Sequence, residues 1–204
     1  MRLGVTLRVT LAAAVMAAVF SLSAAAPAAA QDARRGAALA EERSCAACHG
    51  LGGLSAVPLM PSLAGQQPHF LTLQLILFRE SLRTVPAMAE AVRGLTDEQI
   101  EDLSAYFAAN PSAPNPDRGP RDAGLAARGA ELSVQRNCNV CHLPSYAGRA
   151  QVPRINHQRE DFLLHTLVEY RDNQRVGTDT QMNAVMFGMS DDDIRAIAHY
   201  LAHR

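Results

Sequence analysis

All four cysteines of the chain lie in two copies of the pattern Cys-x-x-Cys-His. The repeated residues are Cys45, Cys48 and His49 in the first copy and Cys138, Cys141 and His142 in the second. Because residues i and i+3 of a helix share a face, both thiols of a pair can add to the vinyl groups along one edge of a porphyrin. The next residue, a histidine, can then bind the iron. This pattern is the attachment signature of c-type haem and predicts two covalently bound c-type haems.

Three other roles are open to such cysteine pairs. A thioredoxin-like redox pair follows a strand and does not need the histidine. A Cys/His zinc site fits the ligand types but would have to draw ligands from both copies. Disulfides Cys45–Cys48 and Cys138–Cys141 suit an oxidising compartment, but they leave both histidines and the duplicated pattern without a role.

A methionine recurs at a matching distance after each of these histidines. Met88 lies 39 residues after His49, and Met182 lies 40 residues after His142. A methionine thioether is the sixth iron ligand of His/Met cytochromes, in which it raises the reduction potential. We therefore predict that His49 and Met88 bind one iron and that His142 and Met182 bind the other.

The other methionines and histidines do not recur in this way. Met60 has no methionine counterpart, while Met186 and Met189 align with Val92 and Leu95, so all three are interpreted as packing or surface residues. The five other histidines are interpreted as structural or surface groups: His69, His157, His165, His199 and His203.

Pro61 and Pro153 also recur in both halves. The carbonyl of each could accept the second ring N–H of the neighbouring haem histidine and so fix its orientation. Each proline could equally well form a simple turn, and spacing alone does not separate the two roles.

These motifs lie in an internal duplication, in which residues 33–109 align with residues 126–203. Between the copies, residues 110–120 hold four of the eleven prolines, which cannot continue a helix. We predict an N-terminal domain over residues 31–110, a stiff Pro-rich linker over residues 111–122 and a C-terminal domain over residues 123–204.

Each half is predicted to be α-helical. A helical segment opens the first half from about Ala33 to Cys48, and Pro68 suits the first turn of a helix that runs over His69–Glu80. Thr96–Gln99 forms a capping-box pattern, and Ser190 is placed to begin the final helix. With no tryptophan, each half has little apolar core of its own, so a bound group is expected to fill its interior.

Residues 1–30 have the three-part layout of a cleaved secretory signal peptide, with Arg2 and Arg8, an apolar run over 9–20 and an alanine-rich exit. The run is short for a membrane span, so we expect a periplasmic protein with at most peripheral membrane contact. The 19 cationic residues are all arginines and the net charge is −1, which argues against nucleic-acid binding.

The chain resembles cytochrome c4, the family of two-domain dihaem class I cytochromes c. The residues that carry the resemblance are 45–50, 61–67, 70–71, 74–75, Arg83, Met88, 95–100 and 105–107, with their repeats. The resemblance implies an all-α fold of two tandem class I cytochrome c domains, each wrapped around one covalently bound haem with His and Met ligands. It also implies that the haem propionate edges lie close together, and that the protein works in the periplasm and can feed a terminal oxidase. Leu143, in place of the usual glycine, and His157, opposite Gly65, depart from the pattern.

We therefore predict an electron-transfer protein without catalytic residues. Its partners would be a redox donor and acceptor, among them a membrane oxidase or a flavoprotein dehydrogenase. If both irons are six-coordinate, neither leaves an open site for substrate. Two alternatives stay open: a cytochrome subunit of a dehydrogenase complex, such as flavocytochrome c sulfide dehydrogenase, and a haem enzyme with an open iron site.

Overall fold

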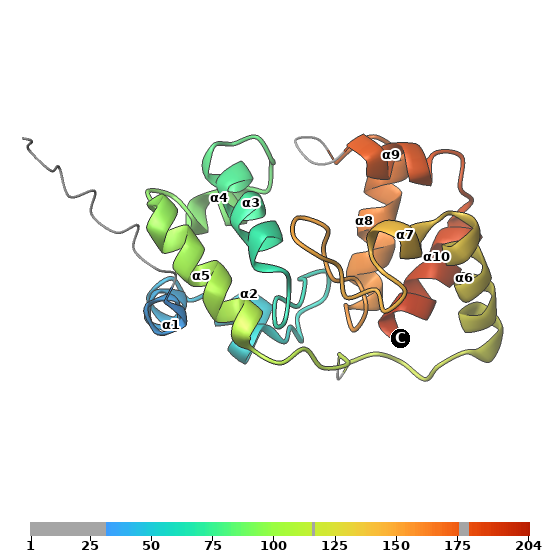
Figure 1. Cartoon of the computed structure of the whole chain (residues 1–204), viewed down its shortest axis with the longest axis horizontal. Coiled ribbons are helices and arrows are strands. Elements are labelled where there is room, and N and C mark those ends of the chain that lie inside the picture. The colour runs from blue at the N-terminus through green and yellow to red at the C-terminus, as the bar shows by residue number, and fades with distance from the viewer. Residues whose placement is uncertain (1–31, 116, 176–179) are drawn as a thin grey trace, which may run out of the picture.

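The computed structural model describes residues 32–115, 117–175 and 180–204. Two groups of helices, one from each half, lie side by side, and the chain after α5 runs along one edge to join them (Figure 1). The first group comprises α1 (Ala33–Glu42), α2 (Ala46–His49), the 3₁₀ turn η1 (Leu51–Gly53), α3 (Pro68–Arg79), α4 (Pro86–Ala91) and α5 (Asp97–Ala109). The second comprises α6 (Ala123–Gln135), α7 (Cys138–Cys141), α8 (Glu160–Arg171), α9 (Thr180–Met186) and α10 (Asp191–Ala202).

The described residues form no strand, and their only β-type pairing is an isolated bridge between Arg149 and Val152. The expected all-α architecture is therefore confirmed. The expected signal peptide over residues 1–30 lies outside the described residues. Within the described part, no helix combines the length and apolar character that a membrane crossing needs.

Local signals set the helix boundaries. Pro68 is the first residue of α3, where its missing N–H costs no hydrogen bond. Thr96 forms the expected capping box with Gln99, and Ser190 caps α10 by accepting from the backbone N–H of Asp193. The opening segment differs from the expectation, because a turn with Ser44 at φ 54° separates α1 from α2. This left-handed residue redirects the chain so that the cysteine pair starts a new helical turn.

The first and last helices of each half pack against each other, α1 on α5 and α6 on α10. A glycine lies at each crossing. A Cβ built on Gly36 would lie 2.0 Å from the carbonyl oxygen of Asp102, and one on Gly129 would lie 2.0 Å from that of Ala196. Only glycine allows the two backbones to approach this closely.

A Gly129→Ala variant is accordingly expected to lose more than ~2 kcal/mol of unfolding free energy, because α6 must move away from α10. The matched control is Ala127→Ser on the exposed side of the same helix, which is expected to change stability by less than ~0.5 kcal/mol. Denaturant unfolding of the holoprotein, followed by helical circular dichroism, measures both. Equal stability of the two variants would contradict the close crossing.

The linker forms no helix over its described residues, as expected, but it is not a free spacer. Asn115 is only 3% exposed and donates from Nδ2 to the carbonyl of Ser55, at 2.6 Å. Asp117 pairs with Arg159 of the second half at 3.0 Å. The linker is therefore anchored to both halves.

Candidate functional site

Each cysteine pair lies on a single helical turn. Cys45 immediately precedes α2, and Cys138 is the first residue of α7. No disulfide joins these four cysteines; Cys45 and Cys138 are partly buried, and Cys48 and Cys141 are exposed. Before haem attachment, burial raises the pKa of the Cys45 and Cys138 thiols.

Both motif histidines are buried and each is held by a prolyl carbonyl. Nδ1 of His49 lies 2.9 Å from the carbonyl oxygen of Pro61, and Nδ1 of His142 lies 2.8 Å from that of Pro153. A carbonyl can only accept, so Nδ1 carries the proton and Nε2 keeps its lone pair for a metal. Burial lowers the pKa of His49, which favours the neutral ring that metal binding requires. The question that spacing left open is thus decided: both prolines provide acceptors.

One cavity of about 1000 Å³ runs between the halves. Its walls include both cysteine pairs, both motif histidines, and Met88 and Met182. Each of these methionines is the third residue of a short helix, α4 or α9, that precedes the last helix of its half. Most of the remaining wall is apolar, which suits a flat, largely apolar macrocycle.

Two of the competing methionines also reach this cavity. Met60 borders it from the loop that precedes Pro61, and Met186 borders it from within the core of the second half, where it is 1% exposed. Met189 is buried away from the cavity walls. Only Met88 and Met182 occupy matching places in the two halves.

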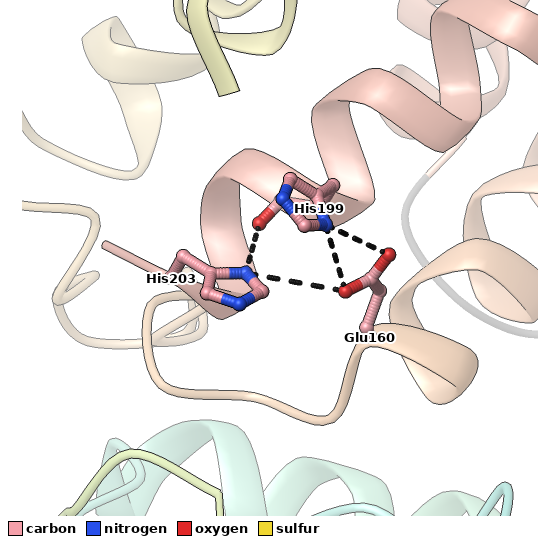
Figure 2. Close-up of side chains that lie close together, drawn as sticks. All are labelled: Glu160, His199 and His203. Carbon is pink, nitrogen blue, oxygen red and sulfur yellow. Dashed lines mark hydrogen bonds and ion pairs between the residues drawn. The ribbon is translucent and has the colours of Figure 1, made fainter. Parts of the chain in front are cut away.

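The other histidines divide between surface and structure. His165 borders the cavity, is exposed, and pairs with Glu169 at 3.3 Å. His199 and His203 lie apart from the cavity and converge on Glu160 (Figure 2). Nδ1 of His199 lies 3.0 Å from a Glu160 oxygen, and Nε2 accepts from the backbone N–H of Asp122.

The hydrogen bonds of this cluster do not suit a metal ion. His203 contacts the carbonyl oxygens of His199 and Gly119, through Nδ1 and Nε2 respectively. Every ring nitrogen of the pair therefore has a partner, and no lone pair faces Glu160 for a metal. The cluster ties the linker and α8 to α10.

A haem carries two propionate carboxylates, so a cavity that fits it should offer positive charge. Arg83 and Arg175 occupy matching positions in the two copies and both border the cavity. Arg83 borders the cavity, donates to Oε1 of Gln74 at 2.6 Å and lies over the ring of Phe78. Burial, together with the nearby charge of Arg175, lowers the pKa of Arg83 to about 9. Nε of Arg175 is buried without a hydrogen-bond partner. Arg175 also pairs with Glu169 at 3.1 Å. Two cations that line the cavity, with one carboxylate between them and one unsatisfied donor, fit a group that brings further negative charge.

Sequence reasoning missed the residues that join the two halves. Gln66 and Gln158 occupy matching positions in the two copies, and both are buried at the interface. Arg154 is 4% exposed and spans the interface, donating to the carbonyls of Gly65 and Ala64. The sequence signal that could have indicated this interface is a glutamine that recurs in both copies without capping a helix.

Comparison with known proteins agrees with this geometry. The family model for cytochrome c matches twice, over residues 33–110 and 126–204. Cytochrome c4 of Thiocapsa roseopersicina is 35% identical, over 77% of this chain and 85% of that protein. A thiosulfate dehydrogenase electron acceptor of Stutzerimonas stutzeri (strain A1501) is 30% identical, over 78% of each chain.

Among solved structures, the crystal structure of reduced recombinant cytochrome c4 from Pseudomonas stutzeri superimposes with a TM-score of 0.75 and 29% identity. The match covers 85% of this chain and 98% of that one. The sequence matches and the structural match therefore indicate the same family. The chain belongs to the cytochrome c4 family, and it carries two covalently attached c-type haems, one in each half.

Proposed function

We propose that this protein is a periplasmic electron carrier that takes an electron at one haem and releases it from the other. When bound, the haems supply reversible one-electron chemistry. Cys45 and Cys48 hold the first haem and Cys138 and Cys141 hold the second. We assign the axial ligands as His49 with Met88 and His142 with Met182.

The observation that carries this proposal is the single cavity bordered by both sets of ligands. Because both sets of ligands border one cavity, two groups seated in it would lie close enough to exchange electrons without leaving the protein. Arg83 and Arg175 face this space and would hold carboxylates between the halves. The prolyl carbonyls keep both imidazoles in the tautomer that binds iron.

The charge distribution supports separate docking faces for the donor and the acceptor. Residues 31–112 carry a net charge of −3, whereas residues 113–204 are neutral overall. Complementary charge mainly raises the rate of encounter between partners. We further propose that residues 1–30 are removed after export, that the domains span residues 31–110 and 123–204, and that residues 111–122 form the linker.

A redox titration of the holoprotein with optical spectra tests this function. We expect two one-electron steps, a low-spin ferric spectrum and slow cyanide binding, because both irons have six ligands. Rapid cyanide binding by either haem would instead support the alternative of an enzyme with an open iron site.

A more specific role is acceptor for a thiosulfate dehydrogenase, because a relative described as such an acceptor is 30% identical over most of both chains. Thiosulfate together with such a dehydrogenase should reduce the holoprotein at a rate that rises with dehydrogenase concentration. Thiosulfate alone is the control and should leave it oxidised. Stable co-purification with a flavoprotein would favour the dehydrogenase-subunit alternative instead.

A further inference from the structure

The two halves exchange a reciprocal pair of glutamine contacts. Oε1 of Gln158 accepts from the backbone N–H of Ser62 at 2.8 Å, and its Nε2 donates to the Ser62 carbonyl at 2.9 Å. Oε1 of Gln66 accepts from the backbone N–H of Arg154 at 2.6 Å, and its Nε2 donates to the Arg154 carbonyl at 2.9 Å. Each glutamine thus clasps the backbone of the opposite half, and both are at most 5% exposed.

The residues that are clasped directly follow Pro61 and Pro153. The N–H of Ser62 belongs to the same peptide group as the carbonyl of Pro61, which accepts from Nδ1 of His49. In the same way, the N–H of Arg154 and the carbonyl of Pro153 form one peptide group, and that carbonyl accepts from His142. Each haem histidine is therefore linked through one peptide group to a glutamine of the other half.

This chain has an electronic consequence. Hydrogen bonds in series polarise one another, by about 10–30% per bond. A peptide N–H that donates to a glutamine makes its own carbonyl a better acceptor, and a better acceptor makes the imidazole a stronger electron donor to iron. Stronger donation stabilises the ferric state and lowers the reduction potential.

We propose that Gln158 lowers the potential of the haem held by Cys45 and Cys48, and that Gln66 lowers that of the haem held by Cys138 and Cys141. Each glutamine is a positioning residue that acts across the interface on the opposite haem. Docking of the halves therefore tunes both potentials. This inference rests on the histidine ligation in the proposed function.

The test measures both potentials of the full-length holoprotein in Gln158→Leu and Gln66→Leu variants. We expect Gln158→Leu to raise the first haem's potential by ~30 mV, which is about a threefold change in the one-electron equilibrium constant. The second haem's potential should shift less. Gln66→Leu should show the reverse pattern. The control is Gln67→Leu, which removes the bond from Gln67 Nε2 to the carbonyl of Ala147 but touches neither prolyl peptide group, and should shift neither potential.

Each potential is assigned in Met88→His and Met182→His backgrounds. If neither background lowers one potential selectively, the ligand assignment of the proposed function fails. Suppose that both backgrounds behave as expected while Gln158→Leu shifts mainly the second haem's potential, both potentials equally or neither. In that case only the present inference fails.

Amide hydrogen exchange separates tuning from loosening of the interface. In Gln158→Leu the Ser62 amide should exchange faster while the Arg154 amide stays protected. If both amides lose protection, the Gln158→Glu variant distinguishes tuning from loosening, because its carboxylate still accepts from the Ser62 N–H. That variant should lower the first haem's potential more than the second's, and any other order overturns the inference.

Discussion

Replacement of Cys138 and Cys141 by alanine is expected to halve the covalent haem content and to leave the second half without its interior. The α7 turn that holds these residues packs against α6, and Cys138 contacts the core of that half. Without covalent attachment the apolar cavity wall would face water, so the second half should lose compactness while the first keeps its haem. Intact mass spectrometry counts the haems, and limited proteolysis reports which half has opened.

The mirror variant, Cys45→Ala with Cys48→Ala, serves as the control. It should also lose one haem, but proteolysis should then begin in the first half. A protein that keeps two covalent haems after either pair of changes would contradict the attachment sites. A colourless product from wild-type protein made in a host that matures c-type cytochromes would contradict the whole assignment.

Met88→His should lower the potential of the first haem by on the order of a few hundred millivolts. An imidazole stabilises ferric iron better than a thioether does, and axial ligands tune haem potentials over about 0.8 V. Met182→His should do the same to the second haem. Each variant should also lose half of the near-infrared charge-transfer band that arises from methionine bound to ferric iron.

Met60→Leu and Met186→Leu are the matched controls, because both methionines also border the cavity. Leucine keeps a similar volume, so neither change should cost much stability. Both variants should retain the full near-infrared band and both potentials. Loss of half the band in Met60→Leu would show that the first iron takes its methionine from the loop before Pro61 and not from α4.

The features predicted from sequence are those that local chemistry determines. The capping box at Thr96, the helix start at Pro68 and the paired cysteine motifs depend on residues a few positions apart. The partner of His49 stayed open because its acceptor is a backbone carbonyl, whose place depends on the loop that carries Pro61. The amino-acid types in this loop do not determine the path of its backbone.

The interface was beyond sequence reasoning for a different reason. Gln158 meets Ser62 across 96 residues, a contact that depends on how two finished domains dock. The linker was expected to be a stiff spacer, and burial of Asn115 against Ser55 shows that it also adds contacts. Polar residues such as these look like surface residues until the second half covers them.

The reciprocal glutamine contact also bears on how such a chain arises. Two surfaces that offer the same atoms to each other form an isologous contact, the kind found in symmetric homodimers. Two separate copies of a one-haem ancestor could therefore pair through this same surface, but only at sufficient protein concentration. Gene fusion through the linker turns that encounter into an intramolecular one, so the pair of haems stays together at any dilution.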